Sequence, residues 1–224
     1  MRLTERYPSL PYVAPFAAFT VLLLVGAHVP VGPRAWAILR VAILAAILGI
    51  FSRGVISWRA AHWLTSISLG IGVFAIWIAP DVFLPSWRAH WFFSNGLTGS
   101  IEGVLPPDAR TDPLRLALRC IRAVILVPII EELFWRAWLP RWLEHREDFR
   151  SIPLGHYTLA TFWLTALLFA SEHGALWDVG LLAGVFYNWW MRRTRNLGDL
   201  ILAHAVTNAC LSAYVILRGR WEYW

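Results

Sequence analysis

The sequence predicts an all-α protein, a polytopic integral membrane helical bundle with about seven transmembrane helices. Two observations carry this prediction. Hydrophobic residues make up 58% of the 224-residue chain and charged residues only 15%, a more apolar balance than ordinary soluble domains have. The apolar residues are also gathered into long blocks, and a helix needs roughly 20 mostly apolar residues to cross a bilayer.

Seven apolar blocks follow one another along the chain, separated by short polar or proline-containing stretches. Residues 52–65 are expected to form a turn or an interfacial helix, and residues 85–113 an extramembrane loop that leaves room for an eighth helix. No repeat is evident, so residues 1–224 are predicted to form one membrane domain. The blocks cover about residues 12–29, 35–51, 66–84, 114–143, 157–173, 176–191 and 197–217.

The charged residues support a membrane location. The net charge is +6, and every basic residue is an arginine, placed mainly between apolar blocks. This leaves no basic stripe for nucleic acid, and more loop arginines fall on the side of the N-terminus, which predicts a cytoplasmic N-terminus. Cys120 and Cys210 lie in apolar stretches and form neither a disulfide framework nor a zinc-ligand spacing.

Several polar residues lie inside predicted spans, where one charge costs roughly 2.5–3.5 kcal/mol. They must therefore pair with each other or face a water-containing cavity. Helix geometry places residues i and i+4 about 40° apart on one face. Glu132 is thus expected to pair with Arg136, leaving Glu131 to face another partner. The same spacing aligns Phe169 with His173 and His204 with Asn208.

These residue types leave several chemistries open. Adjacent glutamates suit a transporter or a proton relay, and histidines with carboxylates suit a metal site. No metal-ligand motif such as HExxH is present. Hydrolysis of a peptide bond without a metal needs a base that activates water and donors that stabilise the oxyanion. Glutamate, histidine and asparagine can supply both, so we predict neither a cofactor nor a metal.

Three short motifs add a family resemblance. Residues 131–136 have the form EExxxR, residues 169–173 the form FxxxH, and residues 204–208 the form HxxxN. In this order on successive apolar segments, they resemble the CPBP family of intramembrane proteases, which includes the type II CAAX prenyl endopeptidases. The motif-bearing core is about residues 114–217, whereas the N-terminal spans within residues 12–84 contain no recognised motif.

The resemblance implies a glutamate-dependent intramembrane endopeptidase and assigns a role to each motif residue. Glu131 and His173 would activate the water, and His204 and Asn208 would form the oxyanion hole. The implied supporting residues are Glu132, Arg136 and Phe169, although Phe169 is equally well explained as core.

The expected substrate is a membrane-associated protein or peptide in the bilayer of a bacterial inner membrane. The tryptophan-rich, lysine-free sequence is similar to a CAAX prenyl protease-related branch found beside exosortase sorting systems, which would make such a system a partner. Two alternatives stay open: a non-catalytic scaffold, immunity or sorting-system partner that keeps the protease fold, and a metal-dependent membrane hydrolase.

Overall fold

The computed structural model describes residues 3–26, 28–84, 86–99 and 105–224, and these residues form helices without a β-strand. Proline, capping side chains and glycine set several helix ends. Asp112 caps α6 with its side chain, and Pro113 occupies the first turn. Thr158 and Thr161 form a capping box at α9. Gly219, at a φ of 65°, ends α11.

The α-helices have the following bounds: α1 Leu3–Arg6, α2 Leu10–Leu24, α3 Pro33–Ile47, α4 Trp63–Phe83, α5 Pro107–Arg110, α6 Pro113–Ile121, α7 Val127–Glu132, α8 Leu139–Glu144, α9 Leu159–Ser171, α10 Trp177–Thr194 and α11 Leu197–Arg218. Three π-helical turns extend or join them: Leu48–Ser52 follows α3, Arg122–Leu126 joins α6 to α7, and Leu133–Trp138 joins α7 to α8. Single 3₁₀ turns lie at Trp87–Ala89, Trp91–Phe93, Phe149–Ser151, Gly174–Leu176 and Trp221–Tyr223.

Each of the seven predicted apolar blocks contains a long helical segment. The block at 114–143 agrees well with an uninterrupted helical path from Pro113 to Glu144. The predicted block at residues 12–29 extends too far, because α2 ends at Leu24, shortly before Gly26. The described parts of residues 85–113 contain short turns and the four-residue α5, so they add no helix long enough to span a bilayer.

Three helical segments are long and apolar enough to cross a membrane: Pro33–Ser52, Trp63–Phe83 and Leu197–Arg218. Leu10–Leu24 and Leu159–Ser171 are apolar but shorter. Large apolar side chains stand exposed on several of these segments, including Leu24, Phe83 and Leu217. Such exposure would be costly in water but suits lipid, and the total of seven spans stays a prediction.

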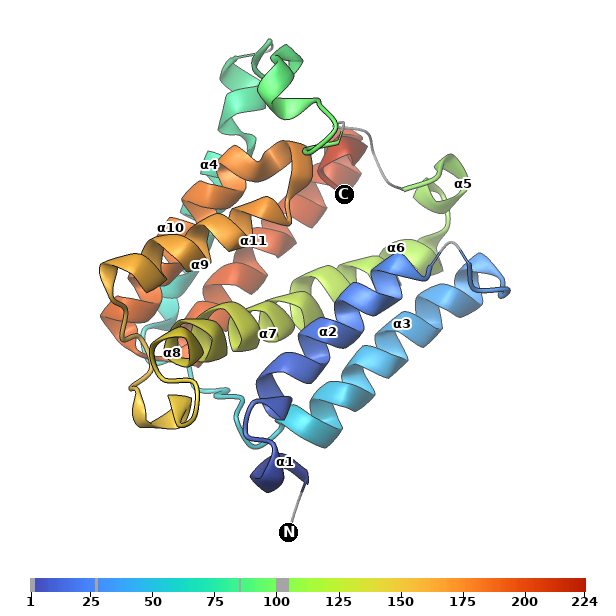
Figure 1. The fold of residues 1–224 in the computed structure, drawn as a ribbon. Coiled ribbons are helices and arrows are strands. Elements are labelled where there is room, and N and C mark those ends of the chain that lie inside the picture. Colours follow the sequence, from blue (N-terminus) through green and yellow to red (C-terminus); the bar gives the residue numbers. More distant parts are fainter. Residues whose placement is uncertain (1–2, 27, 85, 100–104) are drawn as a thin grey trace.

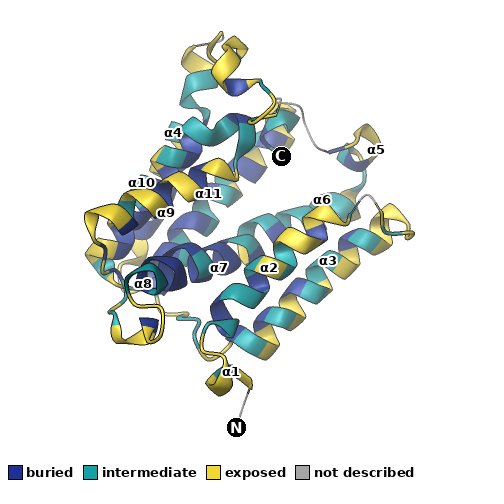
Figure 2. Ribbon diagram, in the orientation of Figure 1, coloured by how far each residue is buried: buried dark blue, intermediate teal, exposed yellow. Residues whose placement is uncertain are grey.

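The helical path α6–α7–α8 lies at the centre of the bundle (Figure 1). Helices α2 and α3 pack along one side of this path, and α11 packs along another, beside the π-helical turn at Arg122–Leu126 and α7. Helices α4 and α10 pack against α11, and α9 packs against α10. Burial is greatest along α7 and the turn that follows it (Figure 2), so the most polar motif occupies the most enclosed helix.

Helices α4 and α11 meet closely at Gly70. A Cβ atom at Gly70 would lie 2.4 Å from the backbone oxygen of Ala203 and 2.8 Å from the Cβ of Val206. Because Gly70 has no side chain, α4 and α11 can approach each other this closely. The contact on α11 is at Ala203, one residue before His204.

The variant Gly70→Ala is expected to destabilise the protein, because the added methyl group must push α4 away from α11. Overpacking of this kind costs about 1–3 kcal/mol, measurable as a lower thermal midpoint of the protein purified in mild detergent. Gly72→Ala is the matched control on the same helix, since nothing lies within 4 Å of a Cβ at Gly72. Equal midpoints for the two variants would contradict the packing argument.

Candidate active site

The first motif lies on α7 between two π-helical turns. Such turns are rare and occur frequently at functional sites. Here they flank the glutamate pair on both sides, with Arg136 inside the second turn. Both Glu131 and Glu132 are buried, and the side chain of Glu132 is fully enclosed.

A buried polar network centres on the Glu132 carboxylate. Arg136 Nη1 donates a hydrogen bond to Glu132 Oε1 over 3.1 Å, which confirms the pairing predicted from helix geometry. The same oxygen lies 2.6 Å from His204 Nδ1 on α11. Because a carboxylate accepts, His204 presents Nδ1–H to Glu132 and directs Nε2 elsewhere. One carboxylate thus joins the first and third motifs.

Groups from two further helices also contact the guanidinium of Arg136, although its Nη2 has no hydrogen-bond partner among the described residues. Its Nε donates to Asn188 Oδ1 on α10 over 3.2 Å. Asn188 in turn donates to the backbone oxygen of Phe162 and to Thr165 Oγ1 on α9. The ring of Phe169 lies 4.1 Å from the guanidinium carbon, a cation–π contact. Phe169 therefore packs against the charged network, a position that suits both a supporting residue and ordinary core.

A cavity of about 300 Å³ gathers the four residues that were predicted to be catalytic. Glu131, His173, His204 and Asn208 all line it, whereas Glu132 and Arg136 are absent from its lining. Across this cavity His204 Nε2 lies 3.9 Å from Glu131 Oε2. The two neighbouring glutamates therefore face different surroundings, one the cavity and the other the closed network. The remaining lining residues are Phe19, Trp77, Arg119, Ala123, Val127, Phe169, Ala183, Tyr187, Thr207, Leu211, Ser212, Tyr223 and Trp224.

His173 reaches the cavity from the turn after α9. The predicted block ended at residue 173, but α9 ends at Ser171. His173 Nδ1 lies 2.7 Å from the backbone oxygen of Phe169, which can only accept, so Nδ1 donates and Nε2 is left as an acceptor. Gly180 on α10 makes room for the ring, because a Cβ there would lie 3.1 Å from His173 Cγ.

Asn208 is held from the opposite wall. Its Nδ2 donates to the backbone oxygen of Ala123 over 2.8 Å. Ala123 lies in the π-helical turn before α7. An amide nitrogen carries two hydrogens, so one N–H of Asn208 is left for a ligand in the cavity.

Sequence reasoning missed three residues that shape this site. The ring of Trp77, on α4, contacts that of His173 edge-on with centroids 5.2 Å apart. Tyr187, on α10, stacks on His204 at 5.0 Å, and its hydroxyl donates to Thr207 Oγ1 over 2.8 Å. Trp77 and Tyr187 lie outside the recognised motifs, and Thr207 occupies an unspecified position of the third motif. Single aromatic or small polar residues within a span give no signal that separates a site wall from ordinary core.

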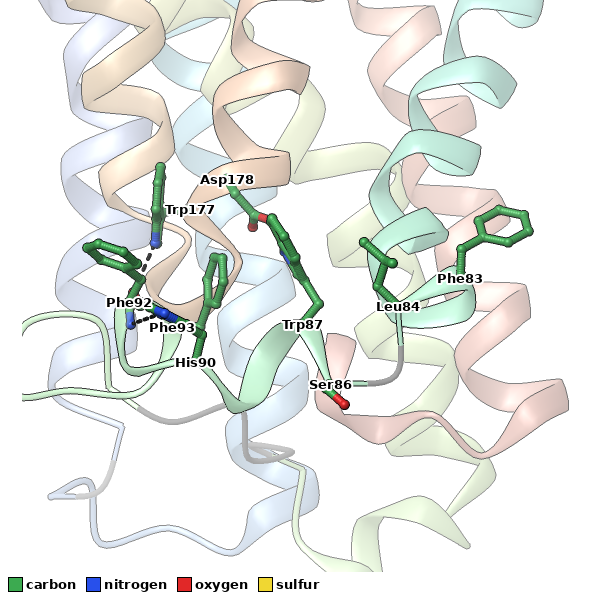
Figure 3. A pocket seen from close by; sticks show the side chains of 9 residues that line it. All are labelled: Phe83, Leu84, Ser86, Trp87, His90, Phe92, Phe93, Trp177 and Asp178. Atoms are coloured by element: carbon green, nitrogen blue, oxygen red, sulfur yellow. Dashed lines mark hydrogen bonds between the residues drawn. The ribbon is translucent and has the colours of Figure 1, made fainter.

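A larger cavity, about 790 Å³, lies away from these motifs (Figure 3). It is lined mainly by aromatic and aliphatic side chains from the end of α4, the turns that follow it and the start of α10. Its acid, Asp178, is already bound by Arg88 Nη1 at 2.5 Å and by Trp87 Nε1 at 2.9 Å. Size alone therefore does not identify the reactive site here. Within the described residues, no group of three or more His, Cys, Asp or Glu side chains is arranged to hold a metal ion.

The fold and the site define a helical integral membrane protein that encloses a polar cavity among its helices. Residues 113–210 match the family described as Type II CAAX prenyl endopeptidase Rce1-like. The match includes all three motifs and confirms the family prediction: this part of the chain is CAAX protease-like, and the family implies a membrane protease. No curated protein and no solved structure matches the chain.

Breaking the Glu132–Arg136 pair is expected to destabilise the fold independently of any chemistry. Arg136→Met leaves a buried carboxylate without its cation, at a cost of about 3–5 kcal/mol. Adding Glu132→Gln removes that charge and should recover much of the loss. Thermal unfolding of the two single variants and the double variant measures the coupling; losses that simply add would show that the pair is not coupled.

Proposed function

We propose that the protein is an intramembrane endopeptidase in which Glu131 activates a water molecule to hydrolyse a peptide bond. The observation that carries the proposal is the shared cavity, which is lined by Glu131, His173, His204 and Asn208. These side chains come from three separate stretches of the chain. Polar residues with a purely structural role would be expected to form hydrogen bonds and ion pairs with one another, as Glu132 and Arg136 do.

Glu131 and His173 suit the activation of water. Glu131 faces the cavity and has no hydrogen-bond donor of its own among the described residues, so its carboxylate is free to accept a proton. His173 donates Nδ1–H to the backbone of Phe169. Its Nε2 can therefore accept a hydrogen bond from the same water and orient the oxygen lone pair toward a substrate carbonyl.

His204 and Asn208 suit the stabilisation of the oxyanion. Asn208 has a free N–H, and His204 directs Nε2 into the cavity. With His204 protonated on both nitrogens, Nε2–H also becomes a donor. The charge on the ring is offset by two nearby carboxylates, since Glu132 Oε1 lies 2.6 Å from Nδ1 and Glu131 Oε2 lies 3.9 Å from Nε2.

The steps balance without another reactant. Glu131 takes a proton from water as the water oxygen bonds to the carbonyl carbon, and the carbonyl oxygen becomes an anion held by Asn208 and His204. The anion then collapses, the C–N bond breaks, and Glu131 returns the proton to the leaving amine nitrogen. The products are a carboxylic acid and an amine, which at neutral pH ionise to a carboxylate and an ammonium group.

The proposed substrate is a membrane-associated protein or peptide whose scissile bond enters the cavity from the bilayer. The apolar lining residues, such as Phe19 and Leu211, suit an extended segment with apolar side chains. We place the protein in a bacterial cell membrane with a cytoplasmic N-terminus, as the loop arginines predict.

Glu131→Gln is expected to lower cleavage by about 10²–10⁴-fold, because an amide cannot take the proton from water. The measurement compares peptides from membranes of cells that carry the wild type or the variant at matched expression. Mass spectrometry should find a C-terminal or juxtamembrane fragment only with the wild type. The exposed Glu147, changed to Gln, is the matched control. His204→Ala should also abolish cleavage while the protein stays folded.

Three results would overturn the proposal. Full activity of folded Glu131→Gln would exclude Glu131 as the base. Identical peptide profiles for wild type and variant, with substrates expressed, would favour a non-catalytic scaffold. Activity that is lost to a chelator and restored by a stoichiometric metal ion would favour a metal-dependent hydrolase.

A further inference from the structure

Four arginines from two neighbouring helices surround one small cavity between α3 and α6. Arg115, Arg119 and Arg122 occur at positions i, i+4 and i+7, so they form a stripe on one face of the helical path. Arg40 on α3 lines the same cavity from the other side. The guanidinium of Arg40 repels those of Arg119 and Arg122. We call this cavity the arginine slot.

Most of this positive charge has no counter-charge among the described residues. Arg115 pairs with Asp108, and its Nη1 lies 2.6 Å from Asp108 Oδ2. Arg122 is only 9% exposed, yet no hydrogen bond or ion pair reaches it within the described part of the chain. Arg40 Nε is buried without a partner. Arg119 contacts the ring of Trp224 but no acid in the described ranges.

An unpaired guanidinium in a low-dielectric surrounding is costly unless a ligand supplies the missing charge. Arg122 is itself more than nine-tenths buried and lines the slot, and Arg40 Nε, on the opposite wall, is buried without a hydrogen-bond partner. Three guanidinium groups around one space suit an oxyanion that carries several acceptors, because guanidinium binds phosphate in a planar, bidentate manner.

The size and walls of the slot indicate which oxyanion. Its volume is about 90 Å³, enough for a phosphate-sized group at roughly 30 Å³ for each displaced water. The walls between the arginines are apolar, with Trp36, Ala37 and Val41 on α3. Beside them Ile38 and Leu39 stand exposed on α3. A lipid can place its phosphate among the arginines and its acyl chains along this exposed surface.

We propose that the arginine slot binds the phosphate of an anionic phospholipid. Basic pockets between transmembrane helices are suited to such head groups. A single substrate carboxylate would leave most of the charge on Arg40, Arg119 and Arg122 uncompensated. Arg119 also lines the cavity that contains Glu131, so the bound lipid lies beside the candidate active site without being part of it.

The first test measures lipid retention by native mass spectrometry of the full chain. The protein is purified from bilayers that contain equal phosphatidylglycerol and phosphatidylcholine. The wild type should retain phosphatidylglycerol preferentially. Arg122→Gln and Arg119→Gln should each reduce that preference about fivefold, the equivalent of about 1 kcal/mol for each arginine. Arg193→Gln, an exposed arginine on α10, is the matched control.

The second test keeps the proposal falsifiable if a variant changes the fold. In detergent without lipid, Arg122→Gln should unfold at a higher temperature than the wild type, because an unpaired buried charge has been removed. Added phosphatidylglycerol should raise the wild-type midpoint and leave that of Arg122→Gln nearly unchanged, reversing their order. A variant that is less stable in both conditions would overturn the proposal.

Three further measurements distinguish a lipid phosphate from other groups that could neutralise the arginine slot. Inorganic phosphate that stabilises lipid-free wild type as well as phosphatidylglycerol does would overturn the lipid as the source. Arginine variants that impair substrate binding with unchanged lipid retention would show that the slot holds a substrate carboxylate instead. Glu102 lies outside the described residues, so Glu102→Gln is included. If the wild type shows no lipid preference and Glu102→Gln does, Glu102 is the counter-charge and the proposal is wrong.

Discussion

The structure depends on the burial of one carboxylate, Glu132. A charge fully removed from solvent persists only where cations and hydrogen-bond donors surround it. For Glu132 these partners are Arg136, one turn further along the same helical path, and His204 on α11. Because Arg136 also binds Asn188 on α10, the need to neutralise one glutamate fixes the register of three helices. The adjacent Glu131 is then left on the face that opens to the cavity. The positions of Glu132 and of the candidate base Glu131 therefore both follow from the need to neutralise the buried Glu132 carboxylate.

Local periodicity explains what could be predicted from the sequence. Helical geometry within a few residues places Glu132 beside Arg136 whatever the rest of the fold does, and long apolar blocks form helices for the same local reason. The convergence of Glu131, His173 and His204 was also predictable in outline, since isolated polar residues in three apolar segments can avoid lipid only by facing each other.

Contacts between distant helices explain what could not be predicted. Asp199 at the start of α11 accepts hydrogen bonds from the backbone nitrogen of His62 at 2.7 Å and pairs with its Nδ1 at 2.8 Å. This contact fixes the beginning of α4, and hence Trp77 beside His173, yet neither Asp199 nor His62 stands out in the sequence. The position of the His173 ring likewise relies on a distant residue, Gly180 of the next helix, where a Cβ would lie 3.1 Å from His173 Cγ. Register between helices is decided by such pairings, and a single sequence does not encode them in its local pattern.

The arginines of the central helical path illustrate two ways of tolerating a charge in a membrane. Arg136 is neutralised by the chain itself, with a carboxylate, an amide and an aromatic ring around its guanidinium, although its Nη2 has no hydrogen-bond partner among the described residues. Arg122, on the same path, is almost as deeply buried but has no such set among the described residues. Burial is costly for both guanidinium groups, and the lipid phosphate proposed above would supply the counter-charge that the described residues do not give Arg122. In a bilayer the abundant molecule with the required charge and an apolar body is a phospholipid. For this fold, the surrounding membrane then acts as a structural component beside the candidate site as well as its solvent.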